Sequence, residues 1–504
     1  MTSHHGAHPR RTRGSRRPVP GTHSPEFDAV GAWTAPALGA GRRAAIRADL
    51  GLGAIAPVVD EVDVAWEPAR WLAGLAEGEV ASLLESSAGP DDVARWSIFG
   101  SAPRFVLTAR ADGRTEVDGT VLDAHLVDVA DALRDPSTAG SGPVPFVGGL
   151  IGYLAYDAGR WFERLPDTVD HDIGTPLAAF AYYEAALVHD GRDDRTYLVR
   201  THPDVDAGPW LDDLATRAPN DAVTTVGRDA VEWNLTRDEY IALVGRARDY
   251  VFAGDVFEVC LSRRFTLPLS GPPAPVYAAL RHRSPSPFAA YCGFADHTVL
   301  SSSPERFLSY DGTRLETRPI KGTSRRHDDP AANAEVVAEM RADRKQMAEH
   351  LMIVDLSRSD LGRICAPGTV AVPHLARAET YSHVNHLVSV IEGRPPAAIG
   401  VRQMLSAAFP GGSITGAPKV RSMEVIDELE PVARGAYTGS VGYLSVDGRV
   451  DLNIAIRTLV AADGRLHGQV GGAVVADSDP AAEWQETEDK AQGMLAALEA
   501  VTPA

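Results

Sequence analysis

The residues that decide the fold class begin with Gly148-Gly149-Leu150-Ile151-Gly152-Tyr153-Leu154-Ala155-Tyr156-Asp157, a short apolar run that predicts a buried, glycine-containing strand. Two further strands are predicted over residues 178–183 and 185–189, before a turn at Asp190-Gly191-Arg192-Asp193. Helical patterns are interleaved with these strands along the chain. The sequence therefore predicts a protein that contains both strands and helices.

The chain divides into three regions by composition. Residues 1–33 are rich in His, Arg, Pro, Gly and Ser and lack the apolar run of a signal peptide, which predicts a disordered basic tail. Residues 218–232 are polar and loosely patterned, which predicts a linker, and Thr236-Arg237-Asp238-Glu239 then matches a capping box at a helix start. We therefore expect an N-terminal region over residues 34–230 and a catalytic region over residues 231–504, as two lobes or one intertwined domain.

The bulk composition excludes several classes of protein. The 504 residues carry a net charge of −19, so no basic field offsets phosphate repulsion, and nucleic acid is not an expected partner. No stretch of about 18 apolar residues occurs, which predicts no membrane span. The cysteines Cys260, Cys292 and Cys365 are widely separated, which favours a reducing cytoplasm over disulfides or zinc. An acidic protein of this kind needs local cations or a metal to bind an anionic substrate.

Lys321 lies in the stretch Arg318-Pro319-Ile320-Lys321-Gly322-Thr323, between a proline and a glycine. This pattern predicts that the amine is held at a tight turn, where it would act as a nucleophile, a cation or a base. A solvated lysine in a surface loop is the alternative.

Glu349 lies on a predicted helix over residues 343–356 that is apolar on most of its sides. A carboxylate on a buried helix needs a partner. That partner is either an arginine or Mg²⁺, which prefers hard oxygen ligands and keeps some positions for water and substrate oxygens.

A second predicted helix starts at Asp479-Pro480, with Asp as the cap and Pro at the first helical position. Glu483, Glu486 and Lys490 follow on one face, at the edge of an apolar stripe. They form either a solvated salt-bridge ladder or, for Glu486 together with Glu349, a pair of metal ligands.

A glycine-rich loop, Phe409-Pro410-Gly411-Gly412-Ser413-Ile414-Thr415-Gly416-Ala417-Pro418-Lys419, precedes a predicted helix over residues 420–429. Free backbone N–H groups at such a junction favour an anion, either a carboxylate or a phosphate. The loop is not a phosphate-binding P-loop, because Gly416 is followed by Ala417-Pro418.

Together these segments resemble the chorismate-utilising enzymes of the anthranilate synthase and aminodeoxychorismate synthase component I family. The resemblance runs from about Leu83 to the last helix, and its most specific stretches are residues 349–356, 381–389, 410–419 and 475–480. It implies an α+β fold in which two large antiparallel β-sheets pack as a sandwich with helices around them.

The resemblance assigns roles to individual residues. It implies Mg²⁺ as the cofactor, held by Glu349 and Glu486 with Glu483 nearby, and chorismate as the substrate. Glu305 matches the general acid for the departing C4 hydroxyl, and His386 matches a catalytic histidine beside that hydroxyl. The implied substrate-binding residues are Thr323, Ser413, Tyr437, Arg457, Gly471, Lys490 and Glu258.

The lysine at position 321 distinguishes two reactions. The resemblance implies Ala at this position in anthranilate synthases and Lys in aminodeoxychorismate synthases, where the amine is proposed to bond to C2 so that ammonia adds at C4. We therefore expect aminodeoxychorismate synthase activity, with anthranilate synthase activity as the alternative. A non-catalytic homologue is disfavoured because the site residues are intact.

Three positions depart from the family pattern: Glu258 replaces a lysine or glutamine, Gln346 an acid, and Ala473 a glycine. The absence of lysine at position 258 argues against water as the nucleophile.

No glutaminase motif is present, so the resemblance implies a separate glutamine amidotransferase that supplies ammonia. Leu84, Glu85 and Ser86, together with Pro287, match the family's tryptophan pocket. A regulatory and a structural role for this pocket remain open.

Overall fold

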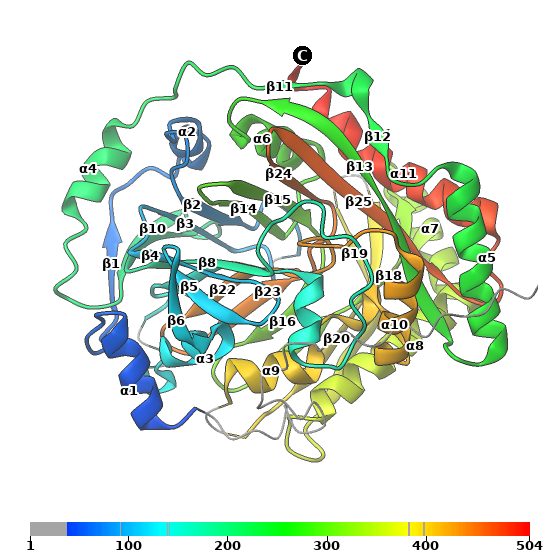
Figure 1. The fold of residues 1–504 in the computed structure, drawn as a ribbon, viewed down its shortest axis with the longest axis horizontal. Coiled ribbons are helices and arrows are strands. Elements are labelled where there is room, and N and C mark those ends of the chain that lie inside the picture. Colours follow the sequence, from blue (N-terminus) through cyan, green and yellow to red (C-terminus); the bar gives the residue numbers. More distant parts are fainter. Residues whose placement is uncertain are drawn as a thin grey trace, which may run out of the picture.

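The structure is a computed structural model that describes residues 38–503 except 91, 139, 141, 382–383 and 397–398. The predicted tail over residues 1–33, like Ser382 and His383 in the 381–389 motif, lies outside the described residues. Two large β-sheets form the body of the protein, and helices surround them (Figure 1). The predicted α+β sandwich of antiparallel sheets is confirmed.

The larger sheet has 14 strands, all antiparallel to their neighbours except the short β11–β26 pair. In spatial order they are β1 (Val58–Val62), β10 (Arg195–Arg200), β9 (Ala185–Asp190), β3 (Trp96–Ser101), β2 (Ala81–Glu85), β14 (Phe288–Gly293), β15 (His297–Ser303), β24 (Thr458–Ala462), β25 (Arg465–Val474), β13 (Glu258–Ser270), β11 (Thr225–Val226) and β26 (Thr502–Pro503), with β12 (Glu232–Trp233) and β21 (Gly416–Ala417) also paired to β13.

The smaller sheet has 12 strands and ends at an edge strand that carries Lys321. In spatial order the strands are β18 (Ile320–Arg325), β20 (Val384–Gly393), β17 (Leu315–Arg318), β16 (Arg306–Tyr310), β23 (Val450–Asn453), β22 (Ser440–Ser445), β7 (Gly149–Leu154), β8 (Ala178–Tyr183), β4 (Phe105–Ala109), β5 (Arg114–Val117) and β6 (Thr120–His125), with β19 (Ala371–Thr380) beside β20.

Helices lie around the sheets, and α5, α7, α8, α10 and α11 gather at one end of the molecule (Figure 1). The helices are α1 (Ala40–Asp49), α2 (Pro68–Ala73), α3 (Leu126–Ala132), α4 (Gly208–Thr216), α5 (Arg237–Ala253), α6 (Ala274–Arg283), α7 (Pro330–Ala342), α8 (Arg344–Gly362), α9 (Val401–Ala408), α10 (Lys419–Leu429) and α11 (Pro480–Leu498), with 3₁₀ turns η2 (Pro136–Thr138), η3 (Tyr156–Trp161), η4 (Arg228–Ala230) and η5 (Gly412–Ile414). No helix in the described part of the chain is long and apolar enough to cross a membrane.

Local sequence signals start three of these helices. Thr236 forms the predicted capping box with Glu239 at the start of α5. Asp479 accepts hydrogen bonds from two backbone N–H groups at the start of α11, and Asp343 does the same for α8. The two helices that carry the predicted metal-site carboxylates therefore begin where the sequence indicates.

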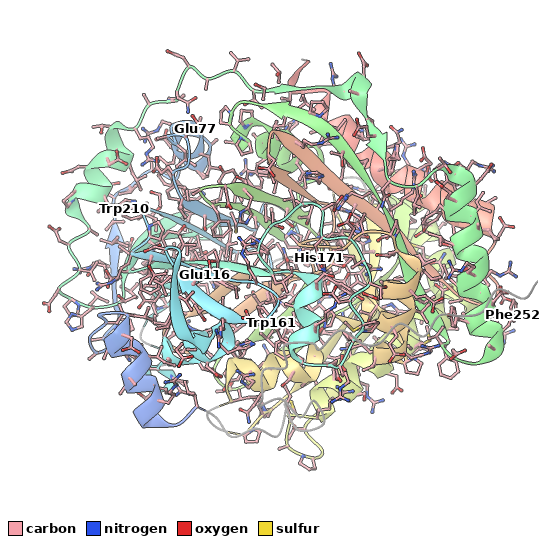
Figure 2. All side chains as sticks on the ribbon, in the orientation of Figure 1. Glu77, Glu116, Trp161, His171, Trp210 and Phe252 are labelled. Carbon is pink, nitrogen blue, oxygen red and sulfur yellow. The ribbon has the colours of Figure 1, made fainter. Side chains whose placement is uncertain are left out.

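Both sheets contain strands from each side of residue 230. In the larger sheet β2 pairs with β14, and in the smaller sheet β7 pairs with β22. Side chains occupy the space between the sheets, and Trp210 on the peripheral α4 donates a 2.9 Å hydrogen bond to Ser101 of β3 (Figure 2). The regions 34–230 and 231–504 thus contribute to the same two sheets.

The prediction of a linker over residues 218–232 was wrong in part. This segment contains β11 and η4 and reaches the first residue of β12, and both strands pair with β13. The polar sequence hides these strands because each is only two residues long and lies beside the long β13, whose backbone groups supply the hydrogen bonds.

A buried ion pair joins α10 to α8. Lys419 Nζ donates to Asp360 Oδ2 and to the carbonyl oxygen of Ala408, each at 2.7 Å. Both side chains are almost fully buried, 6% and 7% exposed. Burial raises the pKa of Asp360 and lowers that of Lys419, whereas the mutual attraction opposes both shifts.

Lys419→Met should therefore lower the free energy of unfolding by about 3–5 kcal/mol, because it leaves the Asp360 carboxylate buried without a cation. Urea or thermal denaturation followed by circular dichroism measures the loss. Arg358→Met is the matched control, since Arg358 forms a comparable pair with Asp355 that is exposed to solvent, and this variant should change stability little. Equal effects of the two substitutions would contradict the assignment.

Candidate active site

The predicted site residues converge at the end of the sandwich where edge strand β18 of the smaller sheet faces β13 of the larger sheet. Helix α8 packs on β18, helix α11 packs on β25, and the glycine-rich loop follows α9 and pairs with β13 through β21. Segments from positions 258 to 490 thus meet at one place.

Lys321 lies in strand β18 and not at a tight turn, so that prediction was wrong in its geometry. The register of β18 against β20 shifts between Ile320 and Thr323, which makes Lys321 and Gly322 a β-bulge. Gly322 has a φ of +85°, a conformation that favours glycine, and a side chain there would lie 3.1 Å from Oε1 of Gln346. The Lys-Gly sequence is thus explained by the bulge, since glycine permits the positive φ and the bulge changes the direction of the Lys321 side chain.

The Lys321 amine forms a buried ion pair. Its Nζ donates to Oε1 of Glu258 at 2.8 Å, with side-chain exposures of 15% for Lys321 and 0% for Glu258. Burial alone would lower the pKa of Lys321, but the charge and hydrogen bond of Glu258 outweigh it and raise the pKa above its ordinary value. Lys321 is therefore an ammonium in this state, whereas the nucleophile that the resemblance implies is a deprotonated amine.

Glu305 has the environment of a general acid. It follows β15, is 4% exposed, and its Oε1 accepts a 2.6 Å hydrogen bond from the Ser413 hydroxyl. Burial raises the pKa of Glu305 to about 7, and Ser413, the Ile320 backbone and Lys321 oppose the shift. A carboxyl with this pKa retains its proton up to neutral pH and can donate it to a leaving group.

His386 is buried on β20 beside Thr323 of β18. Its Nδ1 shares a 2.9 Å hydrogen bond with the Thr323 hydroxyl, whereas Nε2 is buried without a hydrogen-bond partner among the described residues. Burial and the neighbouring Arg457 charge lower the pKa of His386 to about 3, so the ring is neutral. An unpaired ring nitrogen of this kind is available for a hydrogen bond to a ligand.

Arg457 supplies a positive charge to the same region. Among the described residues no hydrogen bond or ion pair of its guanidinium is recorded, although the side chain is half-buried. Burial lowers the pKa of Arg457, and its φ of +51° lies in the left-handed region, which is unusual for a residue other than glycine. A strained backbone and an unpaired buried cation are typical of an anion site. Tyr437, the second residue expected there, is also half-buried.

The three predicted metal-site carboxylates lie on α8 and α11. Glu349 is half-buried, Glu483 is 8% exposed and Glu486 is exposed. Burial raises the pKa of Glu349 and of Glu483, and Glu486 raises both further, so the negative charge of Glu486 repels those of Glu349 and Glu483. Within the described ranges no group of three or more His, Cys, Asp or Glu residues forms a ready cation site.

The donor chemistry nevertheless fits Mg²⁺, which binds one or two carboxylates and completes its shell with water and substrate oxygens. Glu483 Oε2 is buried and has no hydrogen-bond partner among the residues that the structure describes, so it lacks the stabilisation that a cation would supply. Lys490 meets Glu486 instead, at 2.7 Å, and donates to the carbonyl oxygen of Gly471 at 2.6 Å. The Glu486 carboxylate thus belongs to both alternatives for this helix, the salt bridge with Lys490 and the metal site.

Gly472 on β25 keeps the space under these carboxylates open. A Cβ at this position would lie 3.0 Å from Glu483 Oε2 and 3.7 Å from Glu486 Oε1. Gly472→Ala should therefore weaken Mg²⁺ binding by roughly tenfold, the scale of changes behind metal ligands. Titration calorimetry with Mg²⁺ measures the affinity, and Gly493→Ala on α11, which meets no atom within 4 Å, is the control. Unchanged affinity in Gly472→Ala would place the metal elsewhere.

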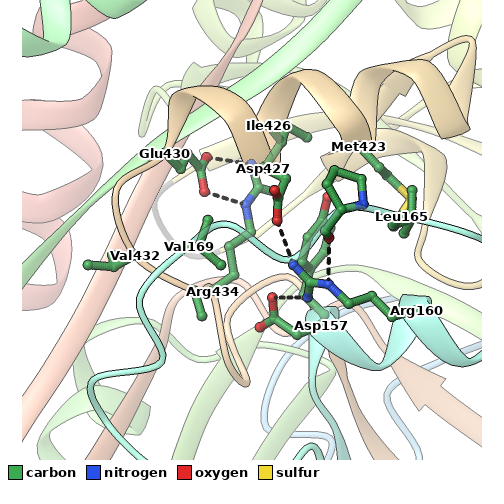
Figure 3. A pocket seen from close by; sticks show the side chains of 13 residues that line it. Asp157, Arg160, Leu165, Val169, Met423, Ile426, Asp427, Glu430, Val432 and Arg434 are labelled. Carbon is green, nitrogen blue, oxygen red and sulfur yellow. Dashed lines mark hydrogen bonds and ion pairs between the residues drawn. The ribbon is translucent and has the colours of Figure 1, made fainter. Parts of the chain in front are cut away.

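A second layer of buried charge, which the sequence analysis missed, supports the site from behind. Arg434 pairs with Glu430 at 2.7 Å and donates to the carbonyl oxygens of Cys260 and Ile414, each at 2.9 Å. These contacts tie β13 to the glycine-rich loop. Figure 3 shows the pair at a cavity of about 20 Å³ that Arg160 also lines. The i,i+4 spacing of Glu430 and Arg434 is the signal that the sequence offers.

The residues of the predicted tryptophan pocket do share one cavity. Leu84, Glu85, Ser86 and Pro287 line a space of about 370 Å³ between the two sheets. The Glu85 carboxylate accepts a 2.9 Å hydrogen bond from the Tyr277 hydroxyl. The cavity is large enough for a small molecule, and tryptophan as its occupant stays a prediction.

Comparisons with known proteins point to one family. A family model described as chorismate binding enzyme matches residues 82–496. Aminodeoxychorismate synthase component 1 of Escherichia coli (strain K12) is 42% identical over 428 residues, covering 83% of this chain and 93% of that protein. Anthranilate synthase component 1 of Streptomyces coelicolor is 38% identical over 446 residues, covering 83% and 84%.

A solved structure shares the fold. Anthranilate synthase component I from Streptococcus pneumoniae TIGR4 superposes with a TM-score of 0.73 at 30% identity, covering 80% of this chain and 92% of that one. The relatives carry both names at similar identity, so they define the family and not the reaction. The chain belongs to the chorismate-utilising enzymes of the anthranilate synthase component I and aminodeoxychorismate synthase family.

Proposed function

We propose that the protein is an aminodeoxychorismate synthase component I, which converts chorismate and ammonia to 4-amino-4-deoxychorismate. The observation that carries the proposal is the placement of the Lys321 amine in the β18 bulge, buried against Glu258 and within electrostatic reach of the acid Glu305. A buried lysine beside a protonated carboxyl supplies both a nucleophile for C2 and a proton for the departing C4 hydroxyl.

The remaining residues have distinct tasks in this proposal. Arg457 and Tyr437 hold the enolpyruvyl carboxylate of chorismate, and His386 donates or accepts a hydrogen bond through its unpaired Nε2. Glu349 and Glu486 would hold Mg²⁺, with Glu483 beside them; when bound, the ion would neutralise the ring carboxylate. Mg²⁺ and Arg457 together would allow a chain of net charge −19 to bind chorismate, which carries two carboxylates.

The covalent route balances in two steps. Lys321 Nζ bonds to C2 while the C4–O bond breaks, and Glu305 gives its proton to the departing oxygen, which leaves as water. Ammonia then bonds to C4, the C2–N bond breaks and Lys321 is released; the excess proton on the new amine returns to Glu305. We also propose that a separate glutamine amidotransferase delivers the ammonia and that the enzyme works in a reducing cytoplasm, in line with three free cysteines.

Product analysis tests the reaction. The protein is incubated with chorismate, Mg²⁺ and ammonium, and the products are separated by chromatography and identified by mass spectrometry. We expect 4-amino-4-deoxychorismate, which an added aminodeoxychorismate lyase converts to p-aminobenzoate. Direct formation of anthranilate would instead establish the second candidate, anthranilate synthase component I, whose name relatives at 38% identity carry.

A further inference from the structure

The carboxylate of Glu258 is buried at the end of β13 with one cationic partner among the described residues. Its Oε1 accepts the hydrogen bond from Lys321, and its Oε2 is buried with no hydrogen-bond partner in the described part of the chain. The Glu258 side chain is 0% exposed, so bulk solvent does not reach the second oxygen. An unsatisfied buried carboxylate oxygen costs free energy, which points to a role beyond holding a strand.

The ion pair is also a chemical obstacle. An ammonium has no lone pair and does not attack carbon, so Lys321 must lose a proton before it can bond to C2. Lysine, unlike arginine, readily loses this proton. The chain contains lysine at only four positions, 321, 345, 419 and 490, among 49 lysine and arginine residues.

Neighbouring groups do not offer an equal acceptor. Glu305 is bonded to Ser413 and serves as an acid, and Glu349 on α8 influences Lys321 electrostatically without an ion pair inside 4.0 Å. His350 of α8 shares a 2.6 Å hydrogen bond between its Nε2 and the Ser389 hydroxyl, and within the described residues its ring makes no hydrogen bond with the Lys321 amine. Cys260, next but one on β13, is a thiol whose pKa burial raises to about 12. Glu258 is the acceptor already in hydrogen-bond contact.

We propose that Glu258 is the proton acceptor that converts the Lys321 ammonium into the nucleophilic amine and returns the proton when the lysine is released. The inference rests on the proposed function and identifies a further catalytic residue for it.

The proton count then closes at every step. Lys321–NH₃⁺ and Glu258–COO⁻ become Lys321–NH₂ and Glu258–COOH, and the amine bonds to C2 as Glu305 protonates the departing hydroxyl. Glu258 stays protonated while the covalent adduct exists. After ammonia has bonded to C4 and the C2–N bond has broken, Glu258–COOH returns its proton to the free amine. No proton is exchanged with solvent to prepare the nucleophile.

Adduct formation on the lysine tests the proposal directly. Wild type, Glu258→Gln and Glu258→Asp react with chorismate and Mg²⁺ without ammonium at pH values between 5.5 and 9. The reactions are then quenched and analysed by intact-mass and peptide mass spectrometry. We expect wild type to gain the mass of chorismate less one water on the Lys321 peptide, at a rate that does not rise with pH. Because only four lysines exist, the modified residue can be assigned unambiguously.

Glu258→Gln keeps the size and the hydrogen bond but cannot accept a proton. We expect it to form the adduct at least about 10²-fold more slowly at pH 7. Below about pH 7, where Glu305 keeps its proton, its rate should rise by up to tenfold per pH unit, because solvent must then take the proton from Lys321. Chorismate affinity, measured by equilibrium dialysis, should stay within about threefold of wild type, which a general loss of packing would not allow. Glu258→Asp should restore a rate that does not rise with pH.

The outcomes separate the two proposals. A wild-type rate of adduct formation in Glu258→Gln at pH 7 would overturn the role of Glu258 while the proposed function stands. If circular dichroism shows that Glu258→Gln does not fold, a rate of adduct formation that rises with pH in folded Glu258→Asp would overturn the role of Glu258 equally. An absence of any Lys321 adduct in wild type, together with anthranilate as the product, would sink the proposed function itself.

Discussion

Lys321→Ala should reduce the formation of 4-amino-4-deoxychorismate by at least about 10³-fold, the scale on which deletion of a covalent nucleophile acts. The amine is the group that bonds to C2 in the proposed route, and no other residue of β18 is a lysine. Without the amine, ammonia is free to add at C2, so we also expect a trace of anthranilate. Chromatography of the products with chorismate, Mg²⁺ and ammonium measures both effects.

Lys321→Arg is the matched variant for this experiment. Arginine keeps a positive charge beside Glu258, so the ion pair and the packing of β18 survive, but the guanidinium does not lose its proton in a protein. Both variants should bind chorismate and both should lack the covalent adduct. Full C4 amination by Lys321→Arg would show that the charge of Lys321 is sufficient, and the covalent role would then be wrong.

Much of the site could be predicted because each part has a local signal. Asp479 and Asp343 mark the starts of α11 and α8, so the positions of Glu483, Glu486 and Glu349 on those helices follow from helical spacing. The packing of two large antiparallel sheets as a sandwich does not follow from any local pattern. It came from the family resemblance, and the strand pairing confirms it.

The contacts that the sequence could not predict are those that cross between the sheets. Glu258 and Lys321 are 63 positions apart, and they meet because an edge strand of one sheet lies against β13 of the other. Such a contact depends on the packing of the whole sandwich. The bulge at Gly322 was misread as a turn for a related reason, since both features need glycine at positive φ and only the partner strand β20 distinguishes them.

Glu305→Gln is expected to lower kcat by about 10²–10⁴-fold, the range for loss of a general acid. Glutamine keeps the hydrogen bond with Ser413 but has no proton to give, so the C4 oxygen would have to leave as hydroxide. Chorismate binding should change little. A loss that appears in KM alone would indicate that Glu305 holds the substrate and does not protonate it.

The pH dependence of kcat provides an independent reading of the same residue. Burial raises the pKa of Glu305 from its ordinary value to about 7, so the protonated acid is present below that pH and is lost as the pH rises through it. Wild-type kcat should therefore fall on the alkaline side of about 7, and residual activity of Glu305→Gln should lack this limb. Ser413→Ala removes a hydrogen bond that lowers the pKa of Glu305, so it should move the limb to higher pH. A limb that stays in place in Ser413→Ala and persists in Glu305→Gln would belong to another group.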